Sequence, residues 1–148
     1  MELKMEISTE ENENMVSAVY ERAMETVHAG KSISKNENTV YQIESLSQEI
    51  NSGASFEQYF RWVRKPEVDS ILECIQVLDM PDVYRIVQEA IIVAFPNGVP
   101  ESENEYEECT EWSENQEESL SRLFERFEDF NGAITNKLGE FILKNGLS

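Results

Sequence analysis

The sequence predicts an all-α fold, a single-domain compact bundle of about seven or eight helices. Apolar residues recur at intervals of three and four in successive segments, which is the spacing of a helix face packed on a core. No stretch sustains the two-residue alternation of a strand. The 148 residues are 40% hydrophobic and include seven Phe, five Tyr and two Trp. One domain over residues 1–148 can therefore bury a substantial core.

The N-terminal part is predicted to hold two helices. Residues 8–11, Ser-Thr-Glu-Glu, have the form of an N-terminal capping box, and residues 1–8 are expected to be a flexible tail. Apolar residues then follow at helical spacing as far as Gly30: Met15, Val16, Val19, Tyr20, Ala23 and Val27. A polar linker over residues 30–38 leads to a second helix over 39–51, which stops at Ser52 and Gly53.

Three shorter helices are expected in the middle of the chain. Ser55 and Gln58 can cap the first, which Pro66 ends or redirects. The next two run over residues 67–78 and 83–95. A Pro-Asn-Gly-Val-Pro loop over 96–100 closes this part. Further on, a break at Asn131 and Gly132 precedes a last helix, whose inward residues are Ile134, Leu138, Phe141 and Ile142.

The negative charge of the chain is concentrated between this loop and this break. Nine of the eighteen residues in 101–118 are Glu and none is Lys or Arg, in a chain of net charge −18. Such charge repels nucleic acid and anionic membranes, so direct binding to either is not expected. The expected partners are basic proteins.

The apolar residues of the acidic segment indicate where its acids point. On a helical wheel seven apolar residues fall within an arc of about 120°: Tyr106, Cys109, Trp112, Leu120, Leu123, Phe124 and Phe127. Seven acids fall within about 80° on the opposite side: Glu103, Glu107, Glu111, Glu114, Glu118, Glu125 and Asp129. If one helix, or two nearly coaxial helices, spans the segment, these acids form a solvent-facing row. We call these seven residues the acidic ridge, and they are the predicted partner-binding residues.

The acidic ridge has two interpretations. It can be a solvated face that keeps the protein soluble, or it can imitate a nucleic-acid backbone. Acids three or four residues apart lie about 4.5–6 Å apart along a helix axis, whereas duplex DNA carries one charge per about 1.7 Å. A DNA mimic therefore needs a second acidic row. The row can come from Glu101, Glu105, Glu108 and Glu117, from the N-terminal helix, or from another subunit, so a homodimer is one candidate arrangement.

Known catalytic and metal-binding patterns are incomplete in this chain. His28 is the only histidine, so its Glu-x-x-His pattern with Glu25 cannot build a helical di-iron site, which needs two such patterns. Residues 30–32 lack the earlier glycine and the preceding strand of a phosphate loop. Tyr106 stands at the glycine position of a calcium loop. No catalytic residue, metal or cofactor is expected, and the protein is predicted not to be an enzyme.

The two cysteines and the N-terminus indicate the compartment. Cys74 and Cys109 each fall on an apolar helix face without a CxxC pattern, which predicts two reduced thiols in the core. Residues 1–4 lack the apolar core of a signal peptide, and the longest apolar run, 90–95, is too short for a membrane span. A cytoplasmic protein is expected.

Two segments resemble a known family. Residues 49–60, Glu-Ile-Asn-Ser-Gly-Ala-Ser-Phe-Glu-Gln-Tyr-Phe, are similar to the Asn-Gly-Gly-Phe-x-Gln-Phe-Phe type segment of a family of small helical bacterial proteins that includes a DNA-mimic protein. Residues 90–100 are similar to that family's helix and following Phe-Pro-x-Gly-x-Pro loop. The resemblance covers about residues 39–145, with one extra residue near Gly53. It implies an all-helical fold and a precedent for an acidic surface that occupies the DNA site of a regulator or nucleoid protein.

The sequence thus predicts a non-enzymatic interaction module. The leading hypothesis is a DNA mimic whose acidic ridge binds a basic DNA-binding protein, either a transcription regulator or a nucleoid protein, and inhibits its DNA binding. A second hypothesis is an immunity protein that neutralises a basic toxin such as a nuclease. A third is a hydrolase that uses buried carboxylates, which requires acids in an apolar cleft.

Overall fold

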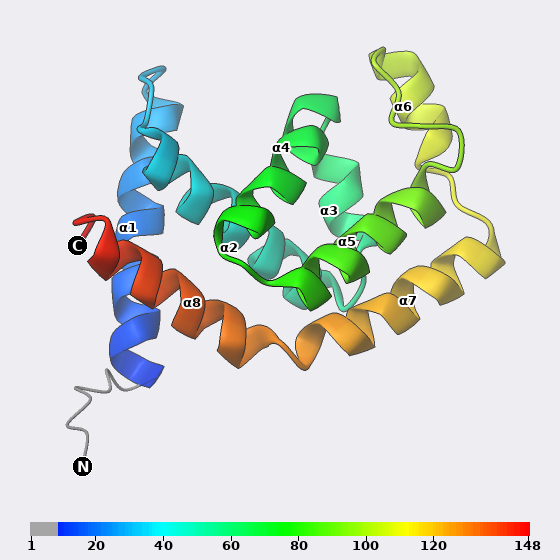
Figure 1. The fold of residues 1–148 in the computed structure, drawn as a ribbon. Coiled ribbons are helices and arrows are strands. Elements are labelled where there is room, and N and C mark those ends of the chain that lie inside the picture. The colour runs from blue at the N-terminus through cyan, green and yellow to red at the C-terminus, as the bar shows by residue number, and fades with distance from the viewer. Residues whose placement is uncertain (1–8) are drawn as a thin grey trace. The chain divides into compact units, whose positions relative to one another are not determined.

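The computed structural model describes residues 9–148, which form eight α-helices and no strand (Figure 1). The helices are α1 (Thr9–His28), α2 (Lys35–Gly53), α3 (Glu57–Trp62), α4 (Lys65–Val77), α5 (Pro81–Ala94), α6 (Glu103–Cys109), α7 (Glu114–Glu128) and α8 (Asn131–Lys144). The predicted all-α class and helix number are confirmed. Residues 1–8, with the expected tail and the Ser8 end of the first predicted cap, lie outside the described residues.

Helix α2 begins four residues earlier than the sequence pattern predicted. The backbone N–H of Ser34 donates to Glu37 Oε1 over 3.1 Å, and the backbone N–H of Glu37 donates to Ser34 Oγ over 3.1 Å. This reciprocal pair is a capping box, which satisfies backbone donors at a helix start. The end of the segment expected to be a linker is therefore helical.

The start of α3 and the role of Pro66 also differ from expectation. Ser55 and Gln58 do not form the predicted capping box, because the Gln58 amide donates to Glu49 Oε2 over 2.6 Å. Pro66 occupies the first turn of α4, where its missing N–H costs no hydrogen bond. The proline therefore starts the next helix.

The described chain divides into two compact units, and the first comprises residues 9–41 and 132–148. It contains α1, the first part of α2 and almost all of α8. Val16, Val19 and Ala23 of α1 are buried, and the rings of Tyr20 and Tyr41 stack with centroids 5.6 Å apart. Arg22 donates to the Leu147 carbonyl over 2.5 Å. Helix α1 is thus held by both apolar and polar contacts.

Helices α1 and α8 approach each other closely at Gly139. The Asn12 side chain is 7% exposed and donates to Asn136 Oδ1 over 3.1 Å. A Cβ atom added at Gly139 would lie 2.0 Å from Asn12 Oδ1 and 2.7 Å from its Cγ. The buried Asn12 amide therefore requires glycine on the facing turn of α8.

The second unit comprises residues 42–131, in which α5 packs against α4 and α7. A chain of ring contacts runs through its core. Phe56 lies 5.7 Å from Phe127 and 6.0 Å from Phe60, and Phe95 lies 5.4 Å from Phe60 and 5.3 Å from Tyr106, measured between ring centroids. These contacts join α3, α7, α6 and the end of α5 into one aromatic core, and such pairs add stability beyond the area they bury.

The helices of residues 9–148 are too short or too polar to span a lipid bilayer. None of them combines the length and the apolar character that a membrane crossing requires.

We predict that Gly139→Ala lowers the free energy of unfolding by about 1–3 kcal/mol, because the new methyl group overpacks Asn12. On an open helix face the same change would stabilise by up to about 1 kcal/mol. Gly132→Ala is the control, because a Cβ at Gly132 meets no atom within 4 Å. Urea unfolding followed by circular dichroism measures both. The double variant Asn12→Ala/Gly139→Ala should lose less than the sum of its single variants, and simple additivity would contradict the clash.

Candidate acidic interaction surface

The acidic segment forms two helices with a capped turn between them. Ser102 Oγ accepts from the Glu105 backbone N–H over 3.2 Å at the start of α6. At the start of α7, Ser113 Oγ accepts from the Gln116 backbone N–H over 3.2 Å, and Gln116 Oε1 accepts from the Ser113 N–H over 2.9 Å. This capping box begins α7 at Glu114 and interrupts the helix that a continuous wheel assumes.

The acidic ridge is consequently divided between two helices whose axes run in different directions (Figure 1). Its members lie on α6 (Glu103 and Glu107), in the turn (Glu111), on α7 (Glu114, Glu118 and Glu125) and just after α7 (Asp129), and all seven are exposed. The alignment expected from one helix or two coaxial helices therefore holds only within each helix. The structure brings these residues to the surface of one unit without forming a single straight row.

A second set of acids lies on the same two helices. Glu101, Glu105, Glu108 and Glu117, the residues expected to flank the acidic ridge, are also exposed. Because Tyr106 is the buried residue of α6, acids cover most of the remaining circumference of this helix. Helix α1, in the other unit, carries a separate exposed set, which is Glu10, Glu11, Glu13, Glu21 and Glu25.

Two ridge acids are neutralised within the chain. Arg64 binds Glu103 with both branches of its guanidinium, Nε to Oε2 over 2.8 Å and Nη2 to Oε1 over 2.6 Å. These hydrogen bonds lower the pKa of Glu103. Arg122 binds Glu118 over 2.5 Å, one turn along α7. Within residues 9–148 no ion pair involves the other five ridge acids.

Side chains from the acidic segment bind backbone carbonyls at the ends of α3 and α5. The buried Tyr106 hydroxyl donates to the carbonyl of Phe60. Trp112 Nε1 donates to the Ala94 carbonyl over 3.1 Å, and the Gln116 amide donates to the Val93 carbonyl over 2.9 Å. The last carbonyls of a helix have no partner within it, so these contacts satisfy them. They also fix α6 and the start of α7 on the second unit.

Two arginines strengthen this attachment. The Arg61 guanidinium lies 5.2 Å from the ring centroid of Trp112, and that of Arg64 lies 4.4 Å from that of Tyr106. Both distances are within the range of cation–π attraction. Arg64 also donates to the carbonyls of Arg61 and Val63 at the end of α3. One arginine therefore contacts an acid of the ridge, an aromatic ring beneath it and the end of α3.

The predicted apolar stripe is confirmed except at two positions. Tyr106, Trp112, Leu120, Leu123 and Phe127 are buried, and Phe124 is half-buried. Cys109 is exposed, so the prediction that both cysteines lie in the core is wrong for this residue, whereas Cys74 is buried. Helix α6 ends at Cys109, and the chain turns before Trp112 can continue the same face. Both thiols are free of disulfides.

The carboxyl of Glu57 on α3 neighbours that of Glu117 on α7. Glu57 Oε1 is buried and has no hydrogen-bond partner in the described part of the chain. Burial raises the pKa of Glu57, and the Glu117 carboxyl raises it further, whereas Arg61 and Ser55 lower it. The ionised Glu57 is thus an unfavourable charge at the margin of the acidic surface.

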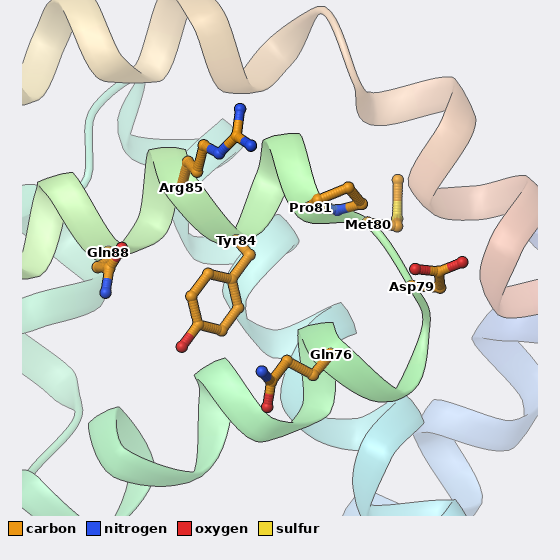
Figure 2. Close-up of a pocket in the computed structure, with 7 residues that line it drawn as sticks. All are labelled: Gln76, Asp79, Met80, Pro81, Tyr84, Arg85 and Gln88. Carbon is orange, nitrogen blue, oxygen red and sulfur yellow. The ribbon is translucent and has the colours of Figure 1, made fainter.

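Outside α6 and α7, helices α4 and α5 border a hollow of about 480 Å³ (Figure 2). Its lining residues are Gln76, Asp79, Met80, Pro81, Tyr84, Arg85 and Gln88. In Figure 2 the Tyr84 ring points into the space between the helices, whereas Arg85 points away from Gln76. The lining carries one acid and one base, so the hollow does not share the charge of α6 and α7.

No group of three or more His, Cys, Asp or Glu side chains in residues 9–148 could hold a metal ion.

We predict opposite effects for two tyrosine variants that each remove one hydroxyl. Tyr106→Phe should lower the free energy of unfolding by about 1–2 kcal/mol, because the buried Phe60 carbonyl loses its donor. Tyr59 is 1% exposed and its hydroxyl has no hydrogen-bond partner among the described residues. Tyr59→Phe should therefore be neutral or stabilising by about 1 kcal/mol. Urea unfolding compares them, and equal losses would contradict the assignment.

We predict a pH-dependent gain in stability from Glu57→Gln. A carboxyl whose pKa is raised on folding destabilises the fold when ionised, so the stability of the wild type falls as pH rises from the pKa of an unfolded glutamate through the raised pKa of Glu57. The variant should melt at higher temperature than wild type near pH 7, and the difference should vanish below about pH 4, near the pKa of an unfolded glutamate. Glu73→Gln, at an exposed position on α4, is the control for the general loss of one charge. An equal melting shift in this control would contradict the prediction.

Comparison with known protein families gives a match. The model of the DMP19-like protein family matches residues 31–145, which contain α2 to α8 and the whole acidic segment. No curated protein and no solved structure matches the chain. The family is one of non-enzymatic DNA mimics. Because the match covers most of the chain, including both segments that carried the resemblance, the chain belongs to the DMP19-like protein family.

Proposed function

We propose that this chain is a DNA mimic that uses the exposed acids of α6 and α7 to bind the DNA-binding surface of a basic protein. The partner is a transcription regulator or a nucleoid protein, which the chain keeps from binding DNA in the cytoplasm. The observation that carries the proposal is the exposure of all seven ridge acids, five of them without an ion pair within residues 9–148. Membership of a DNA-mimic family supports it.

The density of charge on α6 supports mimicry of a duplex. Four acids of this helix, Glu103, Glu105, Glu107 and Glu108, lie within seven residues, a length of about 10 Å at the rise of an α-helix. Because Arg64 neutralises Glu103, the other three acids give about one charge per 3.5 Å, closer to the 1.7 Å or so of duplex DNA than the ridge alone provides. The flanking acids therefore supply the second row that mimicry requires.

Rigid attachment of the acids also favours binding. A flexible acidic tail loses conformational entropy when it binds, whereas charges already held on a folded surface lose less. The contacts of Tyr106, Trp112 and Gln116 with the ends of α3 and α5 hold α6 and the start of α7 in place. The acids can thus meet a basic groove in an arrangement that exists before binding.

The same electrostatics would serve an immunity protein, so the identity of the captured partner separates a regulator from a toxin.

The hydrolase hypothesis needs a carboxyl in an apolar cleft. In residues 9–148 no Asp or Glu is fully buried, and burial raises the pKa of only the half-buried Glu44 and Glu57 without enclosing either in an apolar cleft. We therefore propose a binding role without catalysis.

We predict that the variant Glu107→Gln/Glu111→Gln/Glu114→Gln/Glu118→Gln fails to capture the partner while it keeps the fold. The full chain, immobilised as bait in host lysate at about 50 mM salt, should retain a basic protein that about 200 mM salt releases. Duplex DNA should compete with the bait for that protein.

The matched control is Glu10→Gln/Glu13→Gln/Glu21→Gln/Glu25→Gln on α1, which makes the same change in net charge on the other unit. This control should retain capture. Unchanged capture by the α6–α7 variant, or equal loss in both variants, would contradict the proposed surface.

A further inference from the structure

Trp62, the last residue of α3, exposes 73% of its surface, more than any other large hydrophobic residue in the described part of the chain. The other tryptophan, Trp112, is 9% exposed and donates a hydrogen bond from its indole. Tryptophan is highly buried on average and is enriched in the energetically dominant positions of protein interfaces. The exposed indole of Trp62 is therefore available to contact a binding partner.

Trp62 lies in the segment of the chain that contacts α6 and the turn after it. Its neighbours in sequence contact the acidic segment: the Phe60 carbonyl accepts from Tyr106, Arg61 stacks on Trp112, and Arg64 binds Glu103. Consecutive Cα atoms are about 3.8 Å apart, so the Trp62 backbone is within two residues of each of these contacts. A basic partner that covers α6 therefore lies close to the Trp62 backbone, from which the indole extends into solvent.

The cations near Trp62 are already used within the chain. Arg61 faces the Trp112 ring, Arg64 binds Glu103 and faces the Tyr106 ring, and Lys65 pairs with Asp69 over 3.3 Å. In the described residues the cation–π contacts involve Trp112 and Tyr106, and none involves Trp62. The ring of Trp62 is therefore left open to a cation from a partner.

We propose that Trp62 binds an arginine side chain of the basic partner by stacking its indole on the guanidinium. The inference rests on the proposed function, because it assigns a contact to the same basic partner. Among the aromatic side chains, tryptophan attracts a cation to its ring face most strongly, and a planar guanidinium stacks on it better than an ammonium does. Because no charge is neutralised in this contact, it adds affinity without adding salt dependence. It also gives the partner a contact that the phosphates of DNA do not offer.

The test uses the full chain with nona-arginine and nona-lysine peptides as probes. Trp62→Ala should weaken nona-arginine binding by about 2- to 30-fold, weaken nona-lysine binding less, and leave the slope of log Kd against log salt unchanged. Trp62→Phe should retain part of the affinity, since a phenyl ring attracts a cation less strongly than an indole does. Binding of nona-arginine to wild type should also change the emission of the exposed indole, and this change should be absent in Trp62→Phe.

Ile92→Ala is the matched control, because Ile92 is 61% exposed on α5 and its loss removes apolar surface without a π-system. Equal nona-arginine affinity in Trp62→Ala and wild type would overturn the inference while leaving the acidic surface in place. Failure of wild type to bind either peptide at low salt would instead contradict the proposed function. Self-association of wild type that Trp62→Ala abolishes, seen by sedimentation, would assign the indole to a second copy of the chain and overturn the inference.

Discussion

The acidic surface depends on the satisfaction of backbone carbonyls at the ends of α3 and α5. These carbonyls have no partner within their own helices, and Tyr106, Trp112 and Gln116 supply the donors. Because all three donors belong to the acidic segment, the contacts that complete the two helix ends also attach α6 and α7. The segment is thus held by its polar and aromatic side chains, and its carboxylates remain in solvent.

This attachment opposes the repulsion among the acids. Like charges one turn apart destabilise a helix by about 0.2–0.5 kcal/mol per pair, and neither α6 nor the first half of α7 contains a base to relieve it. Arg64 supplies relief from outside α6 by binding Glu103 while it faces the Tyr106 ring. Most of the other acids form no ion pair within residues 9–148, which is the condition for a surface that attracts a basic partner. Stability and binding therefore make opposite demands on the same side chains.

Local patterns predicted most of the helices, and the errors have local causes. The helical periodicity of apolar residues predicted about seven or eight helices, and the loop at residues 96–100 and the break at 131–132 separate helices as expected. Two boundaries were missed although their signals are present, namely Ser34 with Glu37 and Ser113 with Gln116, which form capping boxes. The second of these boxes divides the acidic ridge. It also leaves Cys109 exposed, because the face predicted for one long helix does not continue through the turn.

The sequence by itself determined the helical class, the concentration of charge and the outward direction of the acids, because these follow from periodicity along one helix. Tertiary structure decided which acids are neutralised, as with Arg64 and Glu103, which are far apart in the chain. It also decided which carbonyls Tyr106 reaches and that Trp62 remains in solvent. Such pairings depend on how helices pack against each other, and the residue pattern of one helix does not specify which other helices pack against it.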